Sequence, residues 1–455
     1  MEQKTKILAT IGPASSTLSE LKKMVTSGMN AVRINTAHGT IPEFKERIRL
    51  VRQLKSIPIV LDIKGPELRV RLQNKIQLRT GKTISLGLTP AFPNHFSYDF
   101  SKEVKPGTHL LFDNGKMTAT ILAYKDKEAI LKITQGGTLL PNKSVTIPNT
   151  HLNIPSLSKK DIEAMHLGKR EKVEYFALSF VRNKSDILNF RRVFEKMPGP
   201  KYPYGLIAKI ENREGVDKVN EILEHVEALM VARGDLSVEI PYEDVPDTQK
   251  QLLNMCQERG ILDICATEML ESMITNIKPT NAEIADVHNA VLDGADCLML
   301  SGETAIGKNP AHVVSTMAKI AAKATCNPRQ LKDFICRNAS DTITASIGNY
   351  TSLADKIICI TRSGYTARRI AGTRPLIPII AITSDQTVWK KLQLDWGINP
   401  ILANLPRTGK IKAAIKILIR EKLIQKKDRC IIIASNYTLG KSIDTVSIAI
   451  PEDLL

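Results

Sequence analysis

Three pairs of charged or polar residues stand at the ends of short β-branched runs, and one position separates the members of each pair. The pairs are Arg33 and Asn35, Lys209 and Glu211, and Ser301 and Glu303. Side chains at positions i and i+2 of a strand point to the same face, so each pair presents two polar groups in one direction. One such pair is usually a solvated strand end. Several pairs at one edge, where an interior charge is costly unless it is paired or coordinated, predict a functional site.

Two carboxylates, Glu211 and Asp235, follow neighbouring runs and are expected to face one another. A small set of oxygen ligands suits Mg²⁺, which keeps coordination positions open for a substrate phosphate. Lys209 and Arg33 supply the positive charge that a transferring phosphoryl group needs. The backbone at Gly234, in a strand-to-helix turn, offers N–H groups to an anion. These residues predict a metal-assisted site for a small, phosphorylated, strongly anionic substrate.

The stretch LSGETAIGKNP, at residues 300–310, partly fits the frame of a phosphate-binding P-loop. Gly302, Gly307 and Lys308 occupy the G-x-x-x-x-G-K positions. A P-loop also needs Ser or Thr after the lysine, because that hydroxyl holds Mg²⁺, and this chain has Asn309 there. We therefore interpret the stretch as an ordinary loop that follows a strand.

Eight β-branched runs position these residues. They span residues 6–11, 31–35, 58–63, 174–180, 205–210, 228–233, 262–267 and 296–301. Helical patterns, such as those at 17–28 and 280–294, separate most of them. Strand–helix alternation repeated eight times predicts a parallel (β/α)8 TIM barrel of the α/β class. The carboxyl ends of all its strands meet at one rim, which is where active sites of such barrels lie.

Two further stretches depart from the barrel pattern. Residues 70–150 alternate apolar and polar positions between Gly turns, which predicts a small all-β insertion. Buried-type runs at 356–361, 377–383 and 429–435, with a surface helix at 413–429, predict a separate C-terminal α/β domain. We expect a barrel made of residues 1–69 and 151–335, an inserted lid of residues 70–150, and a C-terminal regulatory domain of residues 336–455.

The composition is that of a globular protein. Hydrophobic residues make up 43% and charged residues 24% of the chain, and the apolar runs are too short to span a membrane. The N-terminus shows no signal-peptide pattern. The seven cysteines form no C-x-x-C pair, which argues against a zinc site or a disulfide framework and favours a reducing cytoplasm.

The net charge of +17 raises the question of anionic partners. Because the basic residues are spread along the chain and aromatics reach only 5%, we expect neither a nucleic-acid nor a membrane partner. The alternative is a regulatory protein whose basic surface holds nucleic acid, and salt-sensitive RNA binding would favour it.

Eight motifs, in order and spacing, resemble those of the pyruvate kinase family along nearly the whole chain. They are KILATIGPAS, GMNAVRIN, LDIKGPELR, SFVR, KIEN, MVARGDL, ATEMLESM and VLDGADCLMLSGETA. The resemblance implies transfer of the phosphoryl group of phosphoenolpyruvate to ADP, which gives pyruvate and ATP in the last step of glycolysis, by a cytoplasmic homotetramer. Another barrel enzyme that forms a pyruvate enolate, an aldolase or lyase, is the enzymatic alternative; the insertion and the C-terminal domain argue against it.

The resemblance also implies roles for individual residues. Glu211 and Asp235 would hold Mg²⁺ or Mn²⁺, and Lys209 would stabilise the transferring phosphoryl group and the enolate. Arg33 would contact the phosphoryl group, and the Gly234–Asp235 backbone would bind the substrate carboxylate. Near the face where the enolate is protonated, the family pattern places Thr267, Ser301 and Glu303. Toward the nucleotide and in the closing lid, it places Asn35, His38, Arg69, Asp113 and Lys143.

The resemblance also implies a monovalent-cation site. In this chain the matching ligands are Asn35, Asp62 and the backbone carbonyl of Ile63, while Ala37 stands where the family has a serine hydroxyl. Glu67, which goes with potassium dependence in the family, is present. We expect K⁺ to be used, with a response weakened by Ala37.

Other departures concern charge and regulation. Glu268, Asn281 and Asn114 replace a glutamine, an arginine and an acid of the family pattern, and none of them removes the Lys209–Glu211–Asp235 core. In the C-terminal domain, the family's loop for sugar-phosphate or nucleotide effectors resembles residues 361–369, where the cradle would be made by Ser363, Gly364 and Thr366. An ordinary strand–turn–helix connection explains the same residues.

Overall fold

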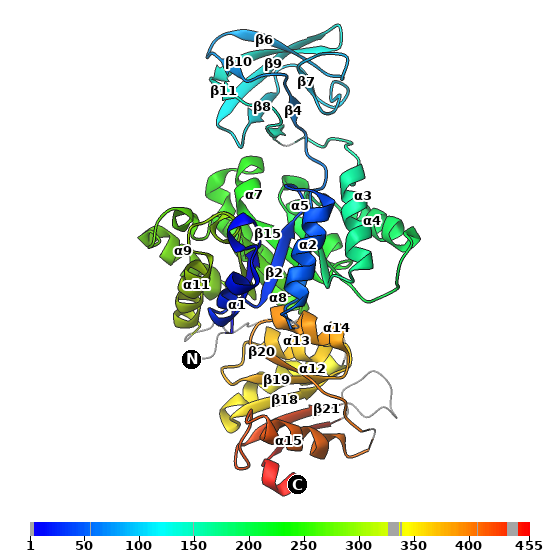
Figure 1. Cartoon of the computed structure of the whole chain (residues 1–455), viewed down its shortest axis with the longest axis vertical. Helices are drawn as coiled ribbons and strands as arrows, with labels where there is room; N and C mark the ends of the chain where they lie inside the picture. Colours follow the sequence, from blue (N-terminus) through cyan, green and yellow to red (C-terminus); the bar gives the residue numbers. More distant parts are fainter. Residues whose placement is uncertain are drawn as a thin grey trace.

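The computed structural model describes residues 4–54, 56–148, 150–325, 336, 339–406, 408–434 and 445–455. Three parts are stacked along the long axis of the molecule, with a β-rich lid above, a barrel in the middle and an α/β domain below (Figure 1). The chain enters the lid after the third barrel strand and returns before the fourth. Cys326, Ser435 and the domain boundary expected at residue 335 lie outside the described residues.

Eight parallel strands close into a barrel in the order β1-β17-β16-β15-β14-β13-β3-β2. They are β1 (Lys6–Thr10), β2 (Ala31–Asn35), β3 (Ile59–Ile63), β13 (Tyr175–Leu178), β14 (Gly205–Ile210), β15 (Ala228–Ala232), β16 (Leu262–Ala266) and β17 (Cys297–Leu300). Each lies inside one of the eight predicted ranges, which confirms the TIM barrel. Nearly every strand residue is buried, as expected for parallel strands covered by helices.

Helices surround the barrel and bury one apolar face against it. They are α1 (Leu18–Thr26), α2 (Ile41–Arg52), α3 (Lys159–Arg170), α4 (Lys184–Lys196), α5 (Arg213–Asp217), α6 (Val219–Leu223), α7 (Arg233–Glu239), α8 (Val245–Arg259), α9 (Asn281–Leu292), α10 (Gly302–Ala305) and α11 (Pro310–Ala324). Side-chain caps begin several of them; the hydroxyl of Ser158, for example, accepts the amide of Asp161 at the start of α3. Among the described residues, no helix has both the length and the apolar character needed to cross a lipid bilayer.

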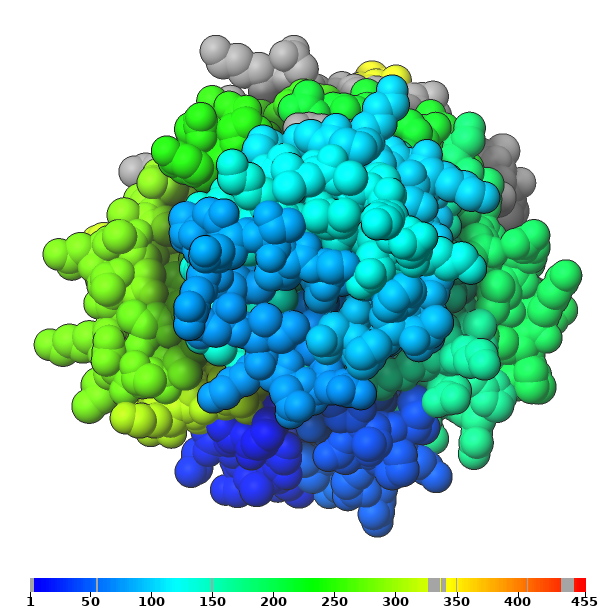
Figure 2. All heavy atoms as spheres, turned by 90° about the horizontal axis from the view of Figure 1, so that it is seen from above, coloured from blue at the N-terminus to red at the C-terminus, as the bar shows by residue number. Residues whose placement is uncertain are grey.

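The lid is an all-β unit with its own core. Its strands are β4 (Val70–Arg71), β5 (Ile76–Leu78), β6 (Thr83–Gly87), β7 (His95–Phe96), β8 (His109–Phe112), β9 (Met117–Lys125), β10 (Glu128–Gln135), β11 (Gly137–Leu139) and β12 (Val145–Thr146). Seven form a sheet in the order β12-β8-β9-β10-β6-β7-β4, and β11 pairs with β5. Phe96, Phe100 and Phe112 pack together on its buried face. Seen from above, the lid covers the centre of the barrel (Figure 2).

The C-terminal domain holds a five-stranded sheet in the order β20-β19-β18-β21-β22. The strands are β18 (Lys356–Ile360), β19 (Ile379–Thr383), β20 (Ile398–Leu402), β21 (Cys430–Ala434) and β22 (Thr445–Ala449), and the helices are α12 (Ala339–Ile347), α13 (Tyr365–Gly372), α14 (Gln386–Lys391) and α15 (Lys410–Arg420). The helix predicted at 413–429 was wrong in its extent. It ends at Arg420, because Lys422 adopts the left-handed conformation with φ of 58°.

The C-terminal domain packs against the end of the barrel opposite the lid. Lys6 at the start of β1 donates a buried hydrogen bond of 2.8 Å to the carbonyl of Ile398. Arg374 forms an ion pair of 2.6 Å with Asp296, which precedes β17. Leu394 joins the apolar core inside the barrel. The domain therefore closes the amino-terminal end and leaves the carboxyl-terminal rim to the lid.

Candidate active site

Asp62, at the end of β3, is the centre of a buried charge cluster at the barrel rim. Its carboxylate accepts a bond of 2.6 Å from Arg33 Nε and one of 3.2 Å from Ser179 Oγ. Lys209 Nζ lies 3.5 Å from the same carboxylate and donates to Ser179 Oγ at 2.7 Å. Burial alone would raise the pKa of Asp62, but Lys209 and Arg33 outweigh burial and lower it. Sequence reasoning gave Ser179 no role; only its bonds to Asp62 and Lys209 reveal one.

Glu211 completes this cluster from the end of β14. Its Oε1 lies 2.8 Å from Lys209 Nζ, and its Oε2 accepts a bond of 2.6 Å from the amide of Phe180. Burial raises the pKa of Glu211 to about 7; Lys209 opposes that shift, and the charge of Asp235 adds to it. For Lys209 the balance is reversed: burial lowers its pKa, but Asp62 and Glu211 together raise it. The ammonium is thus held in its charged form between two carboxylates.

The carboxylates of Glu211 and Asp235 fit a divalent metal ion. Asp235 lies in the first turn of α7, and β14 and β15 are neighbours in the barrel. Glu211 Oε1 is buried, lies 2.8 Å from Lys209 Nζ and makes no hydrogen bond within the described residues. In the same part of the chain, no group of three or more His, Cys, Asp and Glu residues is arranged to hold a metal. Two oxygen ligands with open positions are what Mg²⁺ uses beside a substrate phosphate.

Thr267, just after β16, lies in a strained turn next to α7. Its φ is 69°, which is unusual for a β-branched residue. Its hydroxyl accepts the amide of Gly234 at 2.8 Å and donates to the carbonyl of Ala266 at 2.6 Å. Buried Arg233 donates to the carbonyls of Thr267 at 2.6 Å and Glu268 at 2.9 Å. The strand predicted at 228–233 ends at Ala232, because Arg233 begins α7 and its side chain holds the turn in place.

Ser301 and Glu303 do not share a strand, so the argument that paired them was wrong. The chain turns into α10 directly after Ser301, since β17 ends at Leu300. The Glu303 carboxylate accepts the amide of Ser301 at 2.7 Å and that of Leu270 at 3.3 Å, and burial raises its pKa. Ser301 Oγ is buried and makes no hydrogen bond within the described residues. Glu303 therefore ties the loop after β17 to the loop that contains Thr267.

The three predicted cation ligands lie at the ends of two neighbouring strands: Asn35 on β2, and Asp62 and Ile63 on β3. Asn35 Oδ1 accepts the amide of Ala37 at 2.9 Å, and the carbonyl of Ile63 accepts the amide of Ser179 at 3.2 Å. The oxygens expected to hold K⁺ thus already have partners inside the protein. No hydroxyl stands at position 37 to add to them.

The predicted nucleotide residues are spread over the rim and the lid. His38 is exposed, and Arg69 pairs with Glu67 at 2.6 Å. Lys143 pairs with Asp113 of the lid at 2.8 Å. Arg69 and Lys143 have acidic partners of their own inside the protein. Binding of a nucleotide by these residues stays a prediction.

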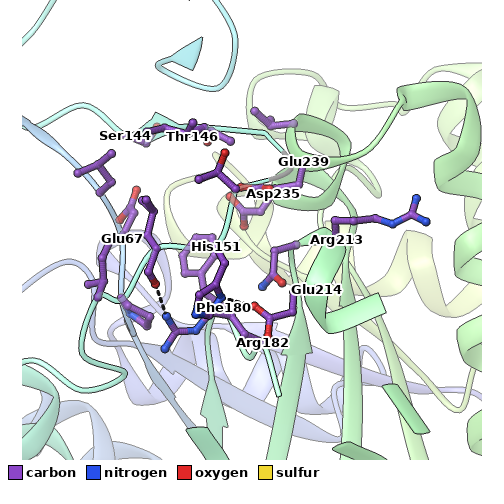
Figure 3. A pocket seen from close by; sticks show the side chains of 18 of the residues that line it. Glu67, Ser144, Thr146, His151, Phe180, Arg182, Arg213, Glu214, Asp235 and Glu239 are labelled. Atoms are coloured by element: carbon purple, nitrogen blue, oxygen red, sulfur yellow. Dashed lines mark hydrogen bonds and ion pairs between the residues drawn. The ribbon is translucent and has the colours of Figure 1, made fainter. Parts of the chain in front are cut away.

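A cleft of about 800 Å³ separates the lid from the barrel rim (Figure 3). Asn114, Ser144 and Thr146 line it from the lid, and Asp235 and Glu239 line it from α7. Sequence reasoning missed Glu239, although its place one helical turn after Asp235 could have signalled it. Burial, with the charge of Asp235 in addition, raises the pKa of Glu239 to about 7. A cleft of this size accommodates a small-molecule substrate.

The proposed effector loop lies far from this cleft, at the end of β18. Gly364, with φ of 81°, precedes α13 and donates its amide to the hydroxyl of Thr361 at 2.9 Å. Ser363 and Thr366 flank it at the start of the helix. Tyr365 donates its hydroxyl to Asp341 at 2.7 Å. This geometry is compatible both with a site for an effector phosphate and with an ordinary strand–turn–helix connection.

A (β/α)8 barrel with a lysine between two carboxylates at its rim, under an inserted β lid, has the architecture of a barrel enzyme with its site at the carboxyl ends of the strands. Comparison with known proteins is more specific. Family models described as "Pyruvate kinase, barrel domain" and "Pyruvate kinase, alpha/beta domain" match residues 2–314 and 344–449. The chain belongs to the pyruvate kinase family, as its motifs predicted.

Relatives that carry the name pyruvate kinase match most of the chain. The protein of Sporosarcina psychrophila is 39% identical over 92% of this chain and 74% of its own length. The protein of Clostridium acetobutylicum is 38% identical over 88% of this chain and 89% of its own length. That of Geobacillus stearothermophilus is 36% identical over 100% of this chain and 81% of its own length.

Proposed function

We propose that the protein transfers the phosphoryl group of phosphoenolpyruvate to ADP, giving pyruvate and ATP. The observation that carries this proposal is the position of Lys209 Nζ, 2.8 Å from Glu211 and 3.5 Å from Asp62 in a buried rim. Phosphoryl transfer demands positioning and charge neutralisation more than covalent chemistry from the protein. A fixed ammonium beside a metal-binding carboxylate supplies both.

The residues of the rim have different roles in the proposed reaction. Glu211 and Asp235 would hold Mg²⁺ or Mn²⁺, which when bound neutralises charge on the substrate oxygens. Lys209 and Arg33 then face the phosphoryl group, and Lys209 also stabilises the enolate that remains. The backbone at Gly234 and Asp235 binds the substrate carboxylate. The lid excludes water, which protects both the phosphoryl group and the enolate.

Protonation of the enolate is assigned to the loops after β16 and β17. The hydroxyl of Thr267 accepts the amide of Gly234, and Glu303 holds the adjoining loop in place. Ser301 completes this region. The monovalent cation is assigned to Asn35, Asp62 and Ile63.

We assign the nucleotide to the lid side of the rim, at Asn35, His38, Arg69 and Lys143. A sugar-phosphate or nucleotide effector would bind at Ser363, Gly364 and Thr366. Residues 70–150 act as the lid and residues 336–455 as the regulatory domain. A homotetramer in the cytoplasm is the form expected for a member of this family.

Pyruvate formation from phosphoenolpyruvate and ADP with Mg²⁺, with and without K⁺, tests the proposal. Lys209→Met should lower kcat by about a thousandfold, since it removes a preorganised charge at the reacting group. Lys308→Met is the matched control, because exposed Lys308 belongs to the P-loop-like stretch and should keep wild-type activity. An inactive wild type under every cation, or an active Lys209→Met variant, would refute the assignment.

A further inference from the structure

Residues 150–157, here called the strap, connect the last lid strand, β12, to the first helix after the lid, α3. The side chains of Leu152 and Ile154 pack against the core of the lid, whereas Leu157 packs against the core of the barrel. The strap therefore packs against both the lid and the barrel. Any displacement of the lid relative to the barrel must change the path of these residues.

Two polar contacts tie the lid end of the strap to the barrel. His151 Nδ1 donates to Glu214 Oε2 at 2.5 Å, with 49% of the His151 side chain and 21% of the Glu214 side chain exposed. Arg182 Nη1 donates to the carbonyl of Leu152 at 2.8 Å. Figure 3 shows His151 directed toward Glu214, with Arg182 beneath it. Leu152 thus has its side chain in the lid core and its carbonyl held by the barrel.

The barrel partners of the strap are themselves held in place. Glu214 accepts bonds from Lys218 at 2.6 Å and from Asn183 at 2.9 Å, so its carboxylate is oriented before His151 reaches it. Arg182 is fixed by bonds to both oxygens of Asp186. A pre-oriented acceptor loses little conformational entropy when the donor arrives.

These partners flank the residues that hold the metal-binding carboxylate. Glu214 lies three positions after Glu211, in the first turn of α5. Arg182 lies two positions after Phe180, whose amide binds Glu211 Oε2 at 2.6 Å. The two contacts of the strap therefore end on the same two short segments that orient Glu211.

We propose that the contacts of His151 with Glu214 and of Leu152 with Arg182 form a latch that holds the lid in register over Glu211 and Asp235. His151 and Arg182 are positioning residues in this proposal, which rests on the proposed function for its kinetic consequence. A lid released from the latch spends less time over the cleft, so substrates are captured less well, while the chemistry of the closed state is unchanged.

Hydrogen exchange of the strap amides, measured on the full-length protein without substrate, tests the latch independently of activity. His151→Ala should speed exchange of residues 150–157 by about tenfold, as expected when one charge-assisted hydrogen bond is lost. His151→Asn should restore slow exchange, because its amide can replace the Nδ1 donor. Arg213→Ala is the control: Arg213 adjoins Glu214 but pairs with Asp217 in the same helix and points away from His151 (Figure 3), so strap exchange should stay at the wild-type level.

Steady-state kinetics supply the second readout. His151→Ala should raise the KM for ADP or phosphoenolpyruvate about three- to tenfold with kcat within about twofold, and His151→Asn should reverse most of the rise. Unchanged strap exchange in His151→Ala would overturn the latch, as would faster exchange throughout the barrel or a loss confined to kcat. A wild type that forms no pyruvate would refute the proposed function, while the exchange comparison would still decide on the latch.

Discussion

The backbone amide of Gly234 donates a hydrogen bond of 2.8 Å to the hydroxyl of Thr267, joining the turns that follow two neighbouring barrel strands. The same amide is the group proposed to bind the substrate carboxylate. Substrate must therefore displace Thr267 from Gly234, or share the amide with it. Arg233 keeps the strained Thr267 turn in place during this exchange, since its bonds go to backbone carbonyls.

Replacement of Thr267 tests this relationship. Thr267→Ala should lower kcat by about a hundredfold, because a positioned hydroxyl for proton transfer is lost. The KM for phosphoenolpyruvate should not rise, since the amide of Gly234 becomes free for the substrate. Thr267→Ser keeps the hydroxyl and should keep most of the activity. Steady-state kinetics of both variants give the answer; a raised KM with normal kcat in Thr267→Ala would contradict it.

Removal of one metal ligand should be visible without any assay of turnover. Glu211→Gln should weaken Mn²⁺ binding, followed by electron paramagnetic resonance, by about tenfold or more. Glu303→Gln is the matched control for metal binding, because the Glu303 carboxylate is buried but is occupied by the amides of Ser301 and Leu270. Equal Mn²⁺ affinity in Glu211→Gln and the wild type would exclude Glu211 as a ligand.

Position 37 should control the response to potassium. Ala37→Ser restores a hydroxyl next to Asn35 and Asp62, so activation by K⁺ relative to Na⁺ should increase by about a few-fold, the effect expected of one added oxygen ligand. Initial rates over a K⁺ titration, compared with the wild type, measure it. Ala37→Gly, which adds no ligand, should leave the K⁺ response as it is. An unchanged response in Ala37→Ser would refute the site.

Lys391 in α14 should make stability depend on pH at the junction of the barrel and the C-terminal domain. Burial, with Arg368 nearby, lowers its pKa from 10.5 to about 8. The unfolded chain thus binds the proton more tightly, so stability rises between about pH 8 and 10.5, and the full cost of burying the charge is present below pH 8. Lys391→Met should stabilise the protein at pH 7 by on the order of 3 kcal/mol, at about 1.4 kcal/mol per pKa unit.

Melting temperatures of Lys391→Met and the wild type, compared at pH 7 and pH 10, test this prediction. The advantage of the variant should shrink at the higher pH. The neighbouring Lys390→Met is a control of opposite sign, because Lys390 pairs with buried Glu174 at 3.0 Å and its loss should destabilise the protein. A difference between Lys391→Met and the wild type that does not vary with pH would rule out the shifted pKa.

The barrel strands and the core of the site could be predicted because their signals are local. Apolar runs that carry Arg33, Asp62 and Lys209 near their carboxyl ends, with Glu211 directly after the last, identify both the strands and the residues at their rim. Once eight such strands are parallel, barrel closure brings those ends together without further information. Strands β20 and β22 were missed, since Pro400 interrupts the pattern of the first, and Val446 and Ile448 of the edge strand β22 are exposed.

The sequence alone determined that the chain is a (β/α)8 barrel with a lid and an α/β domain, and which charged residues meet at its rim. The tertiary structure decided how those residues are partnered: Ser179 between Asp62 and Lys209, Arg233 on the carbonyls of Thr267 and Glu268, and His151 on Glu214. These partners are 30 to 117 positions apart in the chain. Hydrogen bonds depend on distances of a few tenths of an ångström, and only the packed barrel sets such distances between groups that sequence spacing does not relate.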